Sequence, residues 1–165
     1  MHVMIDIRDA VPEDYETVAD LTVIAYIGGG FVDAHSPYAV RLRDTASRAE
    51  KARVRVAEMN GEVVGSVTLA EPATPYADVA QDGELEFRML AVTPDARGCG
   101  VGSALVRDVL DIAYDQGCRA VVMSTQADMA DARRIYERNG FVPAPERNWS
   151  PPSGEELTVL VREIV

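Results

Sequence analysis

Midway along the chain the sequence reads Val92-Thr93-Pro94-Asp95-Ala96-Arg97-Gly98-Cys99-Gly100-Val101-Gly102. An apolar segment ends at the proline, a glycine-rich turn with one arginine follows, and an amphipathic segment begins at once. This order predicts a strand, a tight turn and the first turn of a helix. A helix N-terminus has unpaired backbone N–H groups and a partial positive charge, so it can bind phosphate. We therefore expect a phosphate-bearing ligand at this turn.

Two common phosphate-binding loops do not fit this segment. A Walker loop needs Gly-Lys-Ser or Gly-Lys-Thr, and the turn contains no lysine. A dinucleotide loop needs GxGxxG and an acidic residue at the end of the next strand. Here the third glycine position holds Ser103 or Leu105, depending on which glycine is counted first, and residues 124–126 include no acid. Both alternatives are therefore disfavoured.

What remains is the pattern Arg-x-x-Gly-x-Gly, at Arg97, Gly100 and Gly102. It resembles the acyl-CoA loop of the GNAT superfamily of N-acetyltransferases. Residues 86–94 also resemble the fourth strand of that family, and residues 132–141 resemble its last helix and the following Gly-Phe turn. Three motifs in this order favour membership of the family over a glycine-rich turn without a ligand.

The resemblance implies acetyl-CoA as co-substrate, with no metal ion. Backbone amides of the turn and the first helical turn would hold the pyrophosphate, and the fourth strand and the end of the next strand would flank the pantetheine. Met129 stands where the family often has an asparagine that contacts the cofactor, so we assign no polar contact there. The residues expected to bind the cofactor are Leu90, Ala91, Val92, Arg97, Gly98, Cys99, Gly100, Val101, Gly102, Ser103 and Thr125.

Acetyl transfer to an amine needs a base and an acid. A free alkyl amine has a pKa of about 10, so it is mostly protonated at neutral pH. Glu86 matches the acid on the fourth strand of similar enzymes and is the candidate base, acting directly or through water. The alternatives are that Glu86 is an exposed acid or a partner of Arg88, that Glu84 is the base, or that no side chain acts as base. Tyr136 aligns with the tyrosine that protonates the departing thiolate, unless it is only a core residue. The resemblance implies direct transfer in a ternary complex, which leaves a covalent role for Cys99 poorly motivated.

The acceptor side is less defined by the sequence. The resemblance implies that the N-terminal helices and residues 26–38 form one wall, and the loop around Trp149 can close the site or pack the last hairpin. Aromatic side chains beside an acid suit a cationic amine. We favour a small-molecule amine, with a protein or peptide acceptor and a non-catalytic acyl-CoA sensor as alternatives. The candidate substrate-binding residues are Tyr26, Phe31, Tyr38 and Trp149.

Hydrophobic periodicity predicts one domain over residues 1–165 with the order βααβββαβαββ. The resemblance adds a mostly antiparallel mixed sheet, a V-shaped splay between its fourth and fifth strands, and helices on both faces, which is an α/β mixed sandwich. Leu85, Phe87 and Met89 are expected on one face of the fourth strand, and residues 71–83 form a mobile loop. The predicted strands are Val3–Arg8, Val54–Met59, Glu62–Leu69, Glu84–Val92, Arg119–Thr125, Phe141–Pro143 and Leu157–Val161. The predicted helices begin at Pro12, Ser36, Val101 and Asp128. The first has an apolar stripe that includes Ile24, the second runs to about residue 52 with a polar face that includes Arg48, and the third ends at Gly117. Asn60-Gly61 predicts a hairpin between the second and third strands.

Composition restricts partners and compartment. The formal net charge of −11 disfavours nucleic acid and anionic membranes as partners. Cys99 and Cys118 form no disulfide framework, and the N-terminus lacks the pattern of a signal peptide, so we expect a cytoplasmic protein. The sequence leaves open whether the chain forms a homodimer, as similar proteins commonly do.

Overall fold

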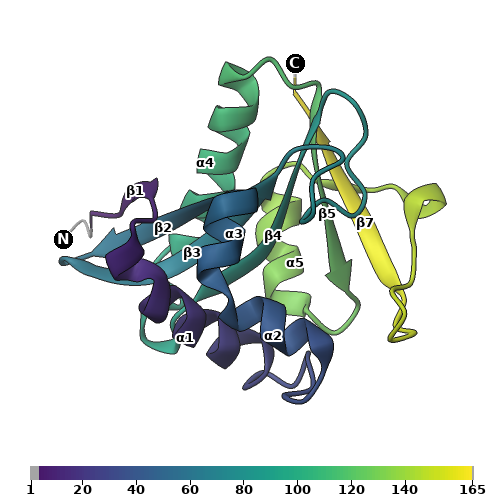
Figure 1. The fold of residues 1–165 in the computed structure, drawn as a ribbon. Coiled ribbons are helices and arrows are strands. Elements are labelled where there is room, and N and C mark those ends of the chain that lie inside the picture. The colour runs from purple at the N-terminus through teal and green to yellow at the C-terminus, as the bar shows by residue number, and fades with distance from the viewer. Residues whose placement is uncertain (1–3, 165) are drawn as a thin grey trace.

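A seven-stranded sheet runs through the molecule, and helices cover both of its faces (Figure 1). The computed structural model describes residues 4–164. The strands are β1 Asp6–Asp9, β2 Arg53–Met59, β3 Glu62–Ala70, β4 Glu84–Val92, β5 Ala120–Gln126, β6 Val142–Pro143 and β7 Leu157–Glu163. The helices are α1 Tyr15–Tyr26, α2 Pro37–Arg43, α3 Thr45–Lys51, α4 Val101–Asp115 and α5 Ala130–Arg138, with short 3-10 turns η1 Pro12–Asp14, η2 Pro94–Ala96 and η3 Pro145–Arg147. The order confirms the predicted α/β class.

The sheet is antiparallel except at its centre. Its strand order is β1-β2-β3-β4-β5-β7-β6, and β4 and β5 are the parallel pair. Their register covers only the first residues of each strand, from Glu84–Ala120 to Glu86–Val122. Beyond Glu86 the two strands no longer pair, so the sheet opens toward their C-terminal ends. This confirms the splay that the family resemblance implied.

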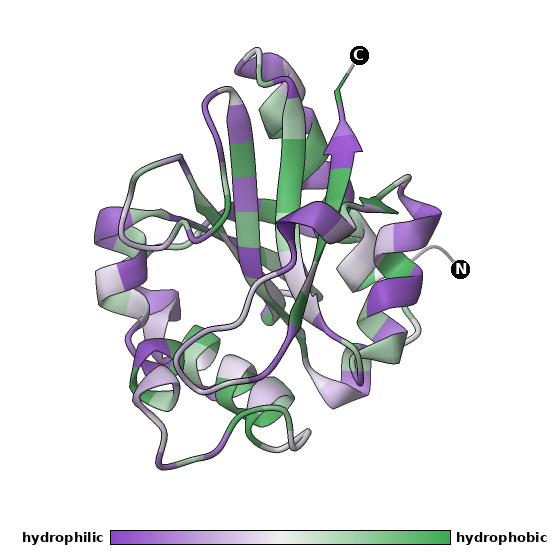
Figure 2. Ribbon diagram, turned by 90° about the vertical axis from the view of Figure 1, so that its right-hand side faces the viewer, coloured by the Kyte–Doolittle hydropathy of each residue, from purple (hydrophilic) through white to green (hydrophobic). Residues whose placement is uncertain are grey.

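Apolar residues on both sheet faces hold the layers together. The core on one face joins α4 and α5 to the sheet, and the cores on the other face join α1, α2 and α3 to it. Burial of each large apolar side chain stabilises the fold by about 1.5–3 kcal/mol. The banding of hydrophilic and hydrophobic residues along the central strands is visible in Figure 2. Core members on the α4 face include Phe87, Leu105, Val109, Val121 and Leu160, and those on the opposite face include Val18, Leu42, Val56, Tyr76 and Met89.

Strand β4 contains a bulge at Met89, whose φ angle is +56°. The register with β3 shifts between Ser66 and Thr68 at the same place. The sequence predicted that Met89 shares a face with Leu85 and Phe87, and this was wrong. The extra residue of the bulge reverses the alternation, so Met89 packs on the α1–α2 face while the other two pack on the α4 face.

The helix predicted from Ser36 to about residue 52 is broken in two. Ser36 caps α2 as expected, accepting a hydrogen bond from the Ala39 N–H group. Asp44 then leaves the helical conformation, and its side chain accepts from the Ser47 N–H group at 3.0 Å, which starts α3. Arg48 was expected on a polar face but is 1% exposed.

The ends of other elements also differ from expectation. The first strand begins at Asp6, and Val3 lies outside the described residues. Ile24, expected in the buried stripe of the first helix, is 52% exposed. The hairpin predicted at Asn60-Gly61 is confirmed, because both residues have positive φ angles. No helix within residues 4–164 has the length and apolar character needed to cross a bilayer.

Candidate active site

The glycine-rich turn between β4 and α4 is open on its outer side. Gly98 and Gly100 have φ angles of +81° and +86°, which L side chains rarely adopt. A Cβ atom placed on either residue would meet no atom within 4 Å. An anion can therefore approach the backbone of the turn closely. Arg97, directly before the first glycine, is exposed to solvent.

The same turn presents free backbone donors. The first hydrogen bond of α4 runs from the Ala104 N–H group to the Gly100 carbonyl at 3.0 Å. The Cys99 N–H group donates to Ala96 at 3.3 Å and is not free. Within residues 4–164, no backbone carbonyl accepts from the N–H groups of Gly98, Gly100, Val101, Gly102 or Ser103. These donors and the helix dipole fit a diphosphate, so the turn suits coenzyme A.

Gly102 brings the next helix close to this turn. A Cβ atom at Gly102 would lie 2.8 Å from the Cδ1 atom of Ile135 on α5. A side chain at this position would require the Ile135 side chain to move. The start of α4 thus packs against α5, the helix that carries Tyr136.

The splay leaves part of β4 without a neighbour on one side. The Thr93 N–H group donates to Val64 on β3 at 2.8 Å. Because successive residues of an antiparallel strand alternate in direction, the Val92 N–H group faces the open side, while that of Ala91, which pairs with Ser66, faces β3. The Leu90 carbonyl also faces the open side, since it accepts from the Tyr26 hydroxyl at 3.1 Å.

A cleft of about 650 Å³ opens from the splay. Its walls come from α1, α2 and the residues between them, from Asp78 in the loop of residues 71–83, from β4 and β5, from α5, and from the segment that precedes β7. The structure brings eight of the predicted site residues together in its lining: Tyr26, Phe31, Tyr38, Glu86, Leu90, Thr125, Tyr136 and Trp149. Ala91, Val92 and the turn of residues 97–103 are not part of this lining.

Tyr136 lines the cleft and packs within a cluster of aromatic rings. Its ring packs edge-to-face against Phe87 and Phe141, with centroid distances of 5.6 and 6.2 Å. The residue is 4% exposed. Burial raises the pKa of the Tyr136 phenol, so its proton is retained at neutral pH and can be donated.

Glu86 is a buried carboxylate, not an exposed strand acid. One of its oxygens, Oε1, accepts from three successive backbone N–H groups, those of Asp78, Val79 and Ala80, at 2.8–3.0 Å. Burial raises the pKa of Glu86, and the N–H groups and the charge of Arg88 oppose that rise. The loop of residues 71–83, expected to be mobile, is therefore tied to β4.

Arg88 joins that loop to α2. Its guanidinium donates to the Asp78 carboxylate at 2.6 Å and to the Tyr76 carbonyl at 2.9 Å. It also donates to the Tyr38 hydroxyl at 3.2 Å and lies over that ring. Burial alone would lower the pKa of Arg88, but its hydroxyl and carboxylate partners raise it, and the net shift is upward. One interpretation of the sequence paired Arg88 with Glu86. In the structure, the carboxylate that Arg88 contacts directly is that of Asp78.

Arg147 was missed by the sequence interpretation. It forms a two-pronged ion pair with Glu84, at 2.8 and 3.0 Å, and donates to the Val79 carbonyl at 2.6 Å. Burial would raise the pKa of Glu84, but the hydrogen bonds from Arg147 and from the Gln81 N–H group hold it below its usual range. The partners lie 63 residues apart in sequence, so no local pattern could reveal them.

The comparison with protein families decides the relationship. A family model described as the acetyltransferase (GNAT) family matches residues 13–141. The chain belongs to the GNAT acetyltransferase family. It is thereby a member of a family of acyl-transferring enzymes that use acetyl-CoA.

Named relatives of this GNAT chain agree. It is 34% identical over 129 residues to a mycothiol acetyltransferase of Cellulomonas flavigena, an overlap of 74% of this chain and 37% of the relative. Its fold matches a GNAT acetyltransferase of Staphylococcus aureus Mu50, with a TM-score of 0.76 and 14% identity over 98% of this chain and all of the other. It also matches a putative acetyltransferase of Salmonella typhimurium bound to acetyl-CoA, with a TM-score of 0.71 and 21% identity over 98% and 94% of the two chains. The chain spans about two fifths of the length of the curated relatives it matches.

Trp149 has a structural contact as well as a place in the cleft of this GNAT fold. Its indole N–H group donates to the Ser124 hydroxyl on β5 at 3.0 Å. Its backbone forms an isolated bridge with Leu157 at the start of β7. The tryptophan thus fixes the segment between η3 and β7 across the open end of the splay.

The charged groups of the cleft are mainly acidic. Four acids (Asp33, Asp78, Glu86 and Glu155) and two arginines (Arg41 and Arg88) line it, which gives a formal charge of −2. Among the described residues, Asp33 and Glu155 form no ion pair within 4 Å, whereas Asp78 is paired with Arg88. Arg41 lies 4.6 Å from the centre of the Tyr76 ring and donates to the Pro75 carbonyl.

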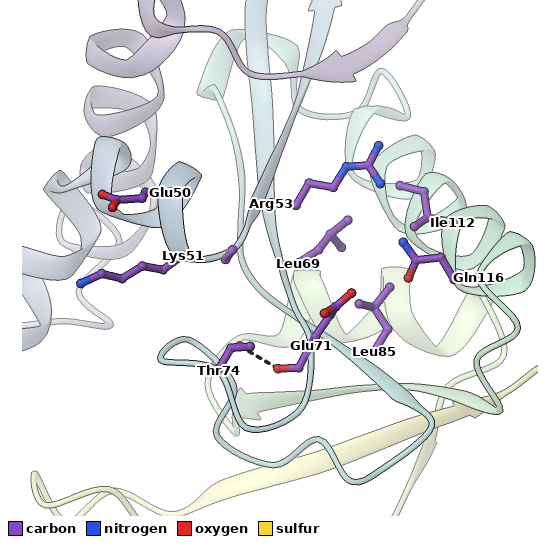
Figure 3. A pocket seen from close by; sticks show the side chains of 10 residues that line it. Glu50, Lys51, Arg53, Leu69, Glu71, Thr74, Leu85, Ile112 and Gln116 are labelled. Carbon is purple, nitrogen blue, oxygen red and sulfur yellow. Dashed lines mark hydrogen bonds between the residues drawn. The ribbon is translucent and has the colours of Figure 1, made fainter.

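A second hollow lies away from the splay (Figure 3). It measures about 230 Å³ and is bordered by α3, the ends of β3 and β4, and α4. Its lining includes Lys51, Arg53, Glu71, Leu85 and Gln116 but none of the predicted site residues. Between residues 4 and 164, no group of three or more His, Cys, Asp or Glu side chains is placed to hold a metal ion.

Proposed function

We propose that this chain transfers the acetyl group of acetyl-CoA to the primary amine of a small molecule, directly and within a ternary complex. The observation that carries the proposal is the splay between β4 and β5. It connects a turn rich in free N–H donors with a cleft lined by the phenol of Tyr136 and the carboxylate of Glu86.

The turn of residues 97–103 would hold the pyrophosphate of the co-substrate. Its N–H groups and the N-terminus of α4 supply the donors, and Arg97 adds a positive charge. The open side of β4 would receive the pantetheine, with the Val92 N–H group as one donor and Thr125 on the opposite wall.

Two side chains of the cleft would move the protons. Glu86 would first take a proton from the ammonium group, through water, using Oε2, and the nitrogen lone pair freed in this way would then bond to the thioester carbonyl carbon. As the carbon–sulfur bond breaks, Tyr136 would donate its proton to the sulfur, and the tyrosinate would take back the proton that the nitrogen loses as the neutral amide forms. The raised pKa of Tyr136 keeps that proton available at neutral pH.

The acceptor would be a cationic amine with an apolar or aromatic body. The formal charge of the cleft attracts a cation, and Phe31, Tyr38 and Trp149 offer aromatic surface. A small molecule is favoured over a protein because the segments around Phe31 and Trp149 border the cleft on two sides.

An acceptor screen tests the proposal. The chain is incubated with acetyl-CoA and single amines, and thiol release and acetylated products are measured. Matched pairs such as phenethylamine with phenylalanine and tryptamine with tryptophan differ only in the carboxylate, and we expect the amine without it to react faster. Calorimetry with coenzyme A runs alongside.

Each outcome of the screen has a distinct meaning. Turnover of peptides but of no small amine would favour a protein acceptor. Coenzyme A binding without turnover of any amine or peptide would favour a sensor. Absence of coenzyme A binding at millimolar concentration would overturn the proposal altogether.

We also propose a cytoplasmic location for this activity. Cys99 and Cys118 are both free thiols, and free thiols persist in reducing compartments. Fractionation of the source cells with immunodetection of the chain would test it, and recovery in an extracellular fraction would contradict it.

A further inference from the structure

We propose that Arg147 is a positioning residue for acceptor recognition: through Glu84 it fixes two walls of the acceptor cleft to β4. This inference rests on the proposed function, because it assigns the walls to the acceptor. The two walls are the loop of residues 71–83 and the segment of residues 144–156.

The first step of the argument is the position of Glu84. It is the first residue of β4 and pairs with Ala120, in the only part of the sheet where β4 and β5 pair within the described chain. Its side chain is 1% exposed. A buried carboxylate needs a charged partner and further donors. Arg147 is the partner, and the Gln81 N–H group at 2.8 Å is a further donor.

The second step is that Arg147 holds both walls at once. It belongs to the segment 144–156, and its third hydrogen bond goes to the Val79 carbonyl in the loop 71–83. The N–H group of the same residue, Val79, donates to Glu86. Val79 therefore bonds both neighbours of the loop: its N–H group bonds Glu86 on β4, and its carbonyl bonds Arg147 in the opposite wall.

The third step links this contact to the cleft. Trp149 lies two residues after Arg147 and lines the cleft, as do Pro151, Pro152 and Glu155 further along. On the other wall Asp78, next to Val79, lines the cleft and orients Arg88 against Tyr38. Loss of Arg147 would remove the contact that joins the two walls and would loosen both, although Glu86 still holds the loop 71–83 and Trp149 still contacts Ser124. The turn of residues 97–103 is not part of either wall.

The expected effect is therefore on the acceptor and not on acetyl-CoA. In Arg147→Met, the KM of the best amine from the screen should rise about tenfold, since small misplacements of positioning groups have effects of this order. The KM of acetyl-CoA should stay within about twofold of wild type. Arg147→Lys keeps the charge but cannot contact both Glu84 oxygens and Val79 together, so its effect should be smaller.

A second readout needs no acceptor. Trp149 is the only tryptophan of the chain, so its fluorescence reports on the segment 144–156 alone. Acrylamide should quench it more strongly in Arg147→Met and Arg147→Lys than in wild type. Circular dichroism and coenzyme A calorimetry verify that each variant is folded; if Arg147→Met does not fold, Arg147→Lys decides.

The matched control is Arg119→Met. Arg119 approaches the same Glu84 carboxylate at 3.4 Å and donates to the Asp82 carbonyl at the end of the loop 71–83 at 3.1 Å. It is 58% exposed, however, and contacts neither the segment 144–156 nor Val79, so it does not join the two walls. It should leave the quenching and both KM values unchanged. The inference would be overturned by any of three results. These are unchanged quenching in both Arg147 variants, effects of Arg119→Met equal to those of Arg147→Met, and a parallel rise of the KM values of the amine and of acetyl-CoA. If no amine reacts, the proposed function fails, and the quenching comparison still decides whether Arg147 fixes the wall.

Discussion

Tyr136 combines two properties that are separable by mutation. Its ring contributes to the aromatic cluster with Phe87 and Phe141, and its hydroxyl supplies the proposed acid. In Tyr136→Phe, kcat should fall by about one to two orders of magnitude while the KM of acetyl-CoA is nearly unchanged. Steady-state kinetics measure this. Tyr114→Phe, at a tyrosine 66% exposed on α4, is the control, and unchanged kcat in Tyr136→Phe would remove this residue from the mechanism.

Glu86 should determine the acidic side of the pH profile. Burial raises the pKa of this carboxyl, and a base acts only when deprotonated. Activity should therefore fall as the pH drops through that raised pKa. Glu86→Gln keeps an oxygen for the three N–H groups of the loop 71–83 but cannot take a proton, so this acidic limb should disappear along with most of the rate. If activity of Glu86→Gln still fell at acidic pH as in wild type, the amine would be deprotonated by solvent and not by Glu86.

Some residue positions could be predicted from local sequence patterns and others could not. The alternation of β4 correctly places Leu85 and Phe87 in the core, because it is a local pattern. Nothing local indicates that Met89 adopts a positive φ angle, that Arg48 is buried, or that Arg147 reaches Glu84. Arg48 donates to the carbonyls of Arg41 and Leu42 at the end of α2; such contacts depend on how helices meet after folding.

At the scale of elements, α4 offers two glycines for a matched comparison. Gly100 at its N-terminus and Gly117 after its C-terminus both have positive φ angles and open space where a Cβ atom would lie. Alanine at either position should destabilise the fold by about 1 kcal/mol through backbone strain. Only Gly100→Ala should also weaken coenzyme A binding, by about tenfold, because its methyl group narrows the turn. Thermal unfolding and calorimetry test the pair; equal affinities in the two variants would argue against a phosphate site there.

Element boundaries were predicted well where the signals are local. Turn and cap residues such as Ser36, Asn60-Gly61 and Gly117 mark helix and hairpin ends directly. The break at Asp44 is different, because the segment from 37 to 51 has no glycine or internal proline to announce it. The helix ends there because the Asp44 side chain caps the Ser47 N–H group and because Arg48 is buried, although the sequence pattern continues as a helix.

For the whole molecule, the N-terminal strand is secured by a charged cluster. Arg8 on β1 donates twice to Asp14, at 2.6 and 3.0 Å, and also bonds Glu58 on β2. The hydrogen bonds from Arg8 lower the pKa of Asp14. The stabilisation from this group is therefore present above the unfolded-state pKa and is lost as the pH falls through the folded-state value.

Asp14→Asn should accordingly lower the Tm at pH 7 by about 4 °C. The difference from wild type should shrink as the pH falls below the ordinary range of aspartate. Thermal unfolding between pH 7 and pH 3 measures it. Asp20→Asn, at an exposed position of α1, should show no difference at any pH, and a constant difference for Asp14→Asn would contradict the ionic explanation.

The global arrangement was accessible from the sequence because three separated motifs matched one family in order. The strand order and the splay then came from that resemblance and not from periodicity, which cannot place strands side by side. The acceptor cleft is the part that sequence predicted least. Its aromatic members were named, but the contacts between its walls depend on residues more than sixty positions apart.

The short pairing of β4 with β5 has a mechanical consequence. Among residues 4–164, the strand pairs from Glu84–Ala120 to Glu86–Val122 are the ones that join the β1–β4 half of the sheet to the β5–β7–β6 half. A small rotation of one half about this corner would leave those pairs intact and would move Val92 and Gln126 the most. A long, thin ligand can thus slide between the strands while every ladder hydrogen bond stays in place.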